Sequence, residues 1–186
     1  MLYTGKGDDG TTHFFGSKER FGKDTPLVEA LGTLDELNSL LGFVKARLGR
    51  QASGKSGSLP SGAKILDEVQ QNLFIIQAEL AGADKKIVES KVREMEKMIG
   101  EIENKLPPIK TFFVPGANLE SGLLDWARAV ARRAERRVVH LAAGPLSKRP
   151  GRFTLAYLNR LSSLLYALAR LHGQKGGKVE KKPTYG

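Results

Sequence analysis

Apolar residues recur along this 186-residue chain at intervals of three and four, the spacing that places side chains on one face of an α-helix. The last such segment is the clearest, because its leucines stand at positions 155, 158, 161, 165 and 168. The pattern predicts helices over about 26–47 (starting at 26 or at 33), 63–81, 87–105, 118–141 and 152–172. These segments predict an all-α fold, a five-helix bundle in a single domain spanning 1–186.

Local signals mark the helix ends. Thr33 followed by Glu36 is a capping-box pattern, which allows the first helix to restart at that point. Pro107 and Pro108 end the third helix, and an extended stretch over 110–115 follows. Three polar segments lack a helical period: an ordered or ligand-ordered loop at 1–24, a flexible Gly/Ser linker at 49–63 and a mobile basic tail at 173–186.

Composition excludes several classes of protein. There is no cysteine, so disulfide frameworks and thiolate metal sites are impossible, and aromatic residues make up only 7%, which disfavours a β-sandwich. No apolar run reaches the ~20 residues that a membrane span needs. The first ten residues lack a signal-peptide core, so a cytoplasmic protein without membrane contact is expected.

The formal charge of +10 indicates an anionic partner, either a nucleic acid or a polyphosphate-bearing nucleotide. Part of the excess lies in tail lysines and part in the arginines at 132, 133, 136 and 137, within the fourth predicted helix. Aromatic residues interleaved with basic ones, the platform that stacks single-stranded bases, do not form an evident pattern in the sequence. A nucleotide is therefore favoured, and nucleic acid stays a lesser alternative.

The stretch YTGKGDDGTT, residues 3–12, contains three glycines within six residues and a lysine. Glycines permit positive φ and bring backbone N–H groups close to an anion, while Lys6 supplies a point charge. Thr and Asp side chains could bind phosphate oxygens or hydrated Mg²⁺. The spacing is not that of a Walker A loop, and a flexible basic N-terminus is the alternative.

Two further groups of residues could carry chemistry. Arg128, Arg132 and Glu135 lie along one face of the fourth helix, one turn after Asp125. Arginine forks suit triphosphate oxygens, although a solvated face with i, i+4 ion pairs is the alternative. The Phe pair in FFVPG, residues 112–116, is either a buried staple or an apolar wall for a large planar ligand. Asn159 stands in a polar patch of the fifth helix, and the three histidines have no ligand-like spacing.

These pieces, in this order, closely resemble the PduO-type ATP:cob(I)alamin adenosyltransferases. The matching stretches are YTGKGDDGTT, KDTPLVEALGTLDELNS (23–39), FFVPG, ARAVARRAERRVV (127–139) and YLNRLSSLLYALAR (157–170). The chain departs from the family pattern at three positions. Many members have His where Asp125 stands, Gly where Ala117 stands and Asp where Ser163 stands.

The resemblance implies a homotrimer with active sites between subunits. It assigns ATP to an N-terminal set and a helical set of residues, namely Thr4, Gly5, Lys6, Gly7, Thr12, Lys23, Arg132, Arg133, Glu135, Arg136 and Asn159. Among these, Arg132 and Glu135 are also expected to be catalytic, together with an acid and an arginine that meet across the subunit interface, Asp35 and Arg128. Phe112 matches the family's aromatic residue beneath the corrin ring of cobalamin.

The implied reaction transfers the 5′-deoxyadenosyl group of ATP to cob(I)alamin, giving adenosylcobalamin and tripolyphosphate. Mg²⁺ is expected to be held through ATP, with no metal site built of protein side chains. A cob(II)alamin reductase and an adenosylcobalamin-dependent acceptor enzyme are implied as further partners. Two alternatives stay open: a non-catalytic ATP- or cobalamin-binding sensor or cofactor carrier, and a basic helical protein that binds nucleic acid.

Overall fold

The computed structural model describes residues 2–14, 19–49, 60–143, 149–175 and 181–185. Within these ranges the chain forms five helices and two short strands. In chain order they are β1 (Thr11–His13), β2 (Arg20–Gly22), α1 (Pro26–Gly49), α2 (Gly62–Leu80), α3 (Glu89–Glu103), α4 (Leu119–Ala142) and α5 (Arg152–Lys175). The prediction of five helices is confirmed.

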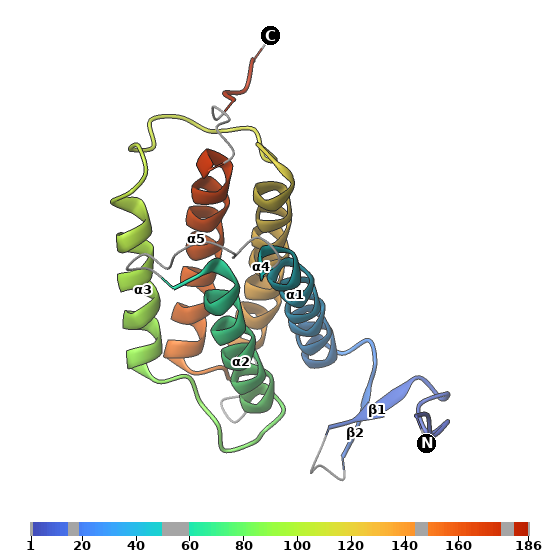
Figure 1. Cartoon of the computed structure of the whole chain (residues 1–186). Helices are drawn as coiled ribbons and strands as arrows, with labels where there is room; N and C mark the ends of the chain where they lie inside the picture. Colours follow the sequence, from blue (N-terminus) through green and yellow to red (C-terminus); the bar gives the residue numbers. More distant parts are fainter. Residues whose placement is uncertain (1, 15–18, 50–59, 144–148, 176–180, 186) are drawn as a thin grey trace.

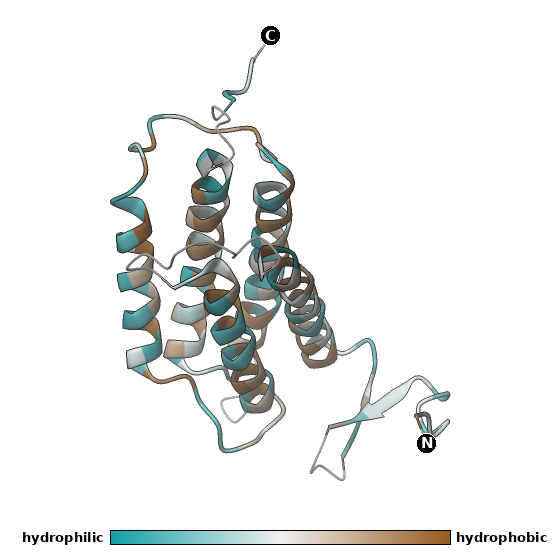
Figure 2. Cartoon of the chain, in the orientation of Figure 1, coloured by the Kyte–Doolittle hydropathy of each residue, from teal (hydrophilic) through white to brown (hydrophobic). Residues whose placement is uncertain are grey.

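The helices pack side by side around one apolar core. Helix α4 packs against α1 and α5, while α1 also contacts α2 and α5 also contacts α3 (Figure 1). Their apolar stripes face the interior, and polar residues cover the outside (Figure 2). The core includes the fully buried Leu34, Leu41, Leu73 and Leu165. A buried polar pair crosses it, in which Asn72 Nδ2 donates to the Tyr157 hydroxyl at 3.0 Å, so both groups keep a hydrogen-bond partner.

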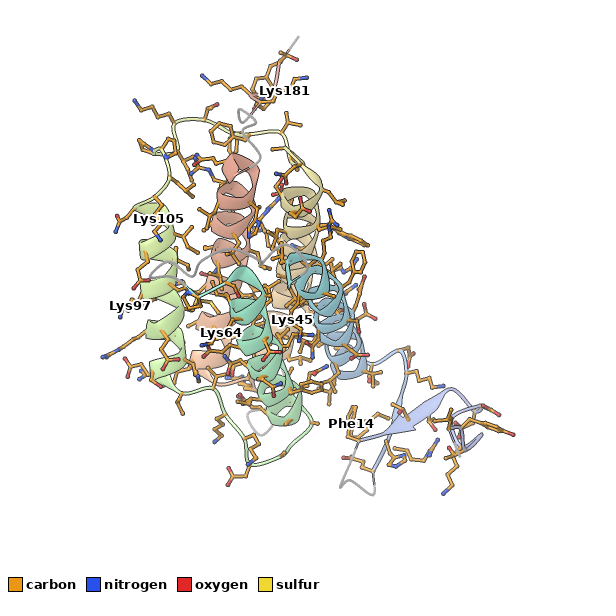
Figure 3. The ribbon with its side chains drawn as sticks, viewed as in Figure 1. Phe14, Lys45, Lys64, Lys97, Lys105 and Lys181 are labelled. Carbon is orange, nitrogen blue, oxygen red and sulfur yellow. The ribbon has the colours of Figure 1, made fainter. Side chains whose placement is uncertain are left out.

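The first 24 residues hold an antiparallel hairpin that the hydrophobic pattern did not predict. Strands β1 and β2 pair in the register Thr11–Gly22, Thr12–Phe21 and His13–Arg20. The hairpin extends away from the helices, beyond the start of α1 (Figure 1), and Phe14 lies in this projecting part (Figure 3). The N-terminal segment is therefore a separate arm rather than a cover for the core of its own chain.

Two helix boundaries differ from the prediction. Helix α1 runs without interruption from Pro26, and the Thr33 hydroxyl donates to the carbonyl of Glu29, one turn earlier, at 2.7 Å. A restart at Thr33 is therefore wrong, because its side chain bonds within the helix instead of capping a new one. Helix α5 continues to Lys175, three residues beyond the predicted end at 172. Residues 50–59 of the predicted linker and 176–180 of the predicted tail lie outside the described residues.

A carboxylate of α2 caps the N-terminus of α5. Glu79 accepts the backbone N–H of Gly151 at 2.7 Å and the hydroxyl of Thr154 at 2.6 Å. Helix α5 carries Asn159 and packs against both α3 and α4. This carboxylate therefore satisfies a backbone N–H that the start of the helix leaves without an intrahelical partner, and it also binds the Thr154 side chain.

We expect Glu79→Ala to lower the free energy of unfolding by about 2 kcal/mol, because two partly buried donors lose their acceptor. Urea denaturation at fixed protein concentration measures the effect. Glu101→Ala is the matched control, since Glu101 makes only a loose pair with Lys97 at 3.9 Å. Equal denaturation midpoints for the two variants would contradict the capping role.

Candidate functional site

The glycine-rich segment folds into consecutive turns. The Asp8 N–H donates to the carbonyl of Gly5 and the Gly10 N–H to that of Gly7, each at 3.2 Å. Gly5 and Gly10 have φ angles of 68° and 79°, as the glycine pattern predicted. The ammonium group of Lys23 donates to the Gly7 carbonyl at 2.8 Å. The structure thus brings Lys23 onto the loop that contains Thr4, Gly5, Lys6, Gly7 and Thr12.

Arg20, on β2, organises this loop and was not among the predicted site residues. Its Nε donates to the Thr11 hydroxyl at 2.7 Å, and its terminal Nη2 contacts the Lys6 carbonyl and the Asp9 carboxylate. The Thr11 hydroxyl and backbone N–H both donate to Asp9 and lower the pKa of that carboxyl. This network holds the loop in shape, while the ammonium group of Lys6 makes no hydrogen bond or ion pair with other described residues.

The arginines of α4 divide into paired and unpaired ones. Arg133 pairs with Glu36 of α1, and Arg137 pairs with Glu29 of α1 at 3.3 Å. Arg132 and Arg136 are exposed and make no hydrogen bond or ion pair with other described residues. The α4 surface is therefore not an uninterrupted cationic stripe of the kind that favours a nucleic-acid backbone. It offers two free guanidinium groups instead.

Glu135 and Asn159 are brought together across the α4–α5 contact. The Asn159 side-chain amide donates to Glu135 at 2.9 Å, and its oxygen accepts from Arg160 at 2.7 Å. Arg160 also donates to Glu96 of α3 at 2.9 Å. Glu135 is thus anchored to the neighbouring helix rather than paired with an arginine of its own helix. Among the described residues neither Arg132 nor Glu135 makes an i, i+4 ion pair within α4, although Arg132 is exposed to solvent as that alternative expected.

The two phenylalanines before Pro115 have different environments. Phe113 is half-buried, and the guanidinium of the buried Arg170 lies 5.3 Å from its ring centroid. Phe112 is 78% exposed. The staple interpretation therefore fits Phe113, while Phe112 presents a free aromatic face.

Helix α4 carries an acid and an arginine close to this loop. Asp125 Oδ2 accepts the backbone N–H of Gly116 at 3.2 Å, and its Oδ1 lies 3.6 Å from Arg128 Nε. Burial raises the pKa of the Asp125 carboxyl. A small recess lies where the loop meets α4 and α5, with Phe113, Asp125, Tyr166 and Arg170 among the residues around it.

Other predicted site residues lie apart within one chain. No hydrogen bond or ion pair of the described residues joins the N-terminal loop to α4, and the hairpin points away from the bundle (Figure 1). Asp35 is exposed on α1 and has no partner among the described residues, whereas Arg128 has Asp125 beside it. A single subunit therefore supplies two separate parts of the predicted ATP site.

Neither a metal site nor a membrane span was found in the part of the chain that the structure describes. No cluster of three or more His, Cys, Asp or Glu residues there is placed to hold a metal ion. No described helix is both long and apolar enough to cross a membrane.

Comparison with known proteins identifies the family. The profile of the cobalamin adenosyltransferase family matches residues 2–172. The chain is 38% identical to a corrinoid adenosyltransferase of Bacillus subtilis, covering 95% of this chain and 88% of that protein. It is 36% identical to the corrinoid adenosyltransferase PduO of Citrobacter freundii, covering 91% of this chain but only 49% of that protein. The chain therefore belongs to the cobalamin adenosyltransferase family and is an enzyme of that family.

Solved structures agree with this assignment. A variant of the PduO-type ATP:corrinoid adenosyltransferase from Lactobacillus reuteri, in complex with cobalamin and ATP, superposes with a TM-score of 0.84 and 28% identity, covering 100% of this chain and 97% of that one. A second variant of the same enzyme, in complex with ATP, superposes with a TM-score of 0.82 and 29% identity, covering 98% of this chain and 100% of that one. The predicted helical fold and family resemblance are confirmed.

Proposed function

We propose that this protein transfers the 5′-deoxyadenosyl group of ATP to cob(I)alamin, at sites completed between the subunits of a homotrimer. The observation that carries the proposal is the set of unpaired cations. Lys6 on the loop and Arg132 and Arg136 on α4 have no anionic partner among the described residues. A triphosphate supplies the missing negative charge, and the relatives named above are enzymes that act on corrinoids.

Separation of the loop from α4 supports a shared site. The loop projects from the bundle, so it can reach α4 of a neighbouring subunit more easily than its own (Figure 1). Helices α1 and α4 also carry exposed aromatic side chains, Phe43 at 59% and Trp126 at 57% exposure. Exposed large apolar groups of this kind are typical of a protein interface. In the assembled trimer, Asp35 of one subunit would pair with Arg128 of the next.

The chemistry needs no nucleophile from the protein. Co(I) of the corrinoid attacks C5′ of ATP, a Co–C bond forms, the C5′–O bond breaks and tripolyphosphate leaves with the bonding electrons. Negative charge grows on the leaving group, so Lys6, Lys23 and Arg132 act by electrostatic stabilisation. Glu135, held by Asn159, would fix the nucleoside part of ATP.

Phe112 would act on the corrinoid. Its exposed ring can cover the lower face of the corrin, excluding water and a lower axial ligand. Loss of that ligand makes the Co(II) precursor easier to reduce by a partner reductase, which is cofactor chemistry tuned by an apolar surface. Mg²⁺ would be bound by phosphate oxygens of ATP, since Asp8 and Asp9 are the loop's only carboxylates and Asp9 is already held by Thr11 and Arg20.

We expect the purified protein, mixed anaerobically with ATP, Mg²⁺ and chemically reduced cob(I)alamin, to form adenosylcobalamin and tripolyphosphate in equal amounts. The spectral change of the corrinoid and phosphate analysis measure the two products. Omission of Mg²⁺ tests whether the triphosphate needs the cation. Tight binding of ATP or corrinoid without either product would instead favour the sensor or carrier function.

A further inference from the structure

Asp125, on α4, contacts both the loop between α3 and α4, which contains Phe112, and Arg128 one turn later on α4. We infer that Asp125 is a positioning residue, which anchors the Phe112 loop to α4 and holds Arg128 in its own subunit. The inference rests on the proposed function, because Phe112 and Arg128 are assigned to the corrinoid there.

The first link runs to the loop. Asp125 Oδ2 accepts the N–H of Gly116, whose φ of 88° lies in the left-handed region that favours glycine. Elsewhere in the loop, the Pro107 carbonyl accepts from Arg170 at 3.0 Å, and the Val114 N–H donates to the Lys181 carbonyl at 2.8 Å. Lys181 belongs to the C-terminal segment beyond the end of α5 (Figure 3). Of these three hydrogen bonds, therefore, only those at Pro107 and Gly116 join the loop to a helix. Phe112 lies between them.

The second link runs along α4. Arg128 Nε is buried and has no hydrogen-bond partner among the described residues, and it forms an ion pair with Asp125 Oδ1 at 3.6 Å. The guanidinium also lies 5.8 Å from the Tyr166 ring centroid, so its direction is set by a carboxylate and an aromatic face. The Asp125 side chain is only 13% exposed, which strengthens its attraction for Arg128 relative to a surface pair.

The two oxygens of Asp125 therefore serve different partners. A shift of the loop against α4 would weaken the Gly116 bond, and a rotation of Arg128 would leave the other oxygen without its counter-charge. In the proposed trimer, the guanidinium of Arg128 would lie between Asp125 of its own subunit and Asp35 of the neighbour. Asp125 would thus hold the arginine ready before the second carboxylate arrives.

Asparagine and alanine at this position separate the two links. Asp125→Asn keeps an oxygen that can accept the Gly116 N–H but removes the charge beside Arg128, whereas Asp125→Ala removes both. We expect both variants to raise KM for cob(I)alamin about tenfold while KM for ATP stays within about twofold. Only Asp125→Ala should also lower the fraction of four-coordinate cob(II)alamin, measured by electronic and EPR spectra with ATP bound, as Phe112→Ala should.

Three comparisons keep the test decisive. Asp67→Asn, which removes an exposed acid of α2 that pairs with Lys45 of α1, should leave both KM values and the spectra unchanged. In an Arg128→Ala background, Asp125→Asn should raise KM for cob(I)alamin by less than a further twofold, because the two residues act together. Unchanged corrinoid KM and spectra in Asp125→Ala, or a parallel rise of both KM values with a lower melting temperature, would overturn the inference. Wild-type turnover in the same assay tests the proposed function separately.

Discussion

Arg132→Ala is expected to reduce kcat by about a hundredfold to a thousandfold, the usual cost of removing one preorganised group that stabilises transition-state charge. Arg132 is exposed, has no partner among the described residues and contributes nothing to the core. Its removal should therefore leave the fold and the assembly intact. Lysine should not restore activity fully, because a single ammonium cannot contact two phosphate oxygens in the planar geometry of a guanidinium.

A matched control lies on the same helix. Arg137 is also an exposed arginine of α4, but it pairs with Glu29 of its own chain and is not part of the proposed site. Arg137→Ala should keep kcat and both KM values within about twofold of wild type, since surface ion pairs contribute little. Anaerobic steady-state assays with pre-reduced cob(I)alamin give kcat and both KM values for wild type, Arg132→Ala and Arg137→Ala. If the two variants lose activity to the same extent, Arg132 has no special role in leaving-group stabilisation.

The sequence predicted the helices because each has enough turns to repeat its apolar spacing. Leu34, Leu41, Leu161 and Leu165 were expected in the core and are fully buried. The hairpin was missed because β1 and β2 have three residues each, too few to establish a period of two. Thr33 was misread because a threonine hydroxyl can bond to the preceding turn as readily as it caps a helix.

Prediction of the site was limited by contacts between distant segments. The spacing of Asp125 and Arg128 within α4 placed them one turn apart, and the structure confirms that neighbourhood. The role of Arg20 depends on the register of β1 with β2, which sets its side chain diagonally across from Thr11. Likewise, the bond from Gly116 to Asp125 depends on the path of a loop with no regular structure. Spacing along the chain carries no signal for either contact.

Mixed trimers of two inactive variants should regain activity if each site is shared between subunits. Lys6→Glu destroys the loop half by repelling triphosphate, and Arg132→Ala destroys the α4 half. In a closed ring of three subunits, every mixed trimer has one site with an intact loop from one subunit and an intact α4 from the next. Such trimers should therefore show about a third of wild-type kcat, although each parent homotrimer is nearly inactive.

Co-expression with two different affinity tags and purification on both tags isolates the mixed trimers, and the same anaerobic assay gives their kcat. Size-exclusion chromatography with light scattering confirms that the species assayed is a trimer. A double variant carrying both changes, mixed with wild type, controls for damage to assembly. If loop and α4 of one chain formed the site together, each subunit of a mixed trimer would carry one damaged half. Activity would then stay at the parental level, and the shared site would be refuted.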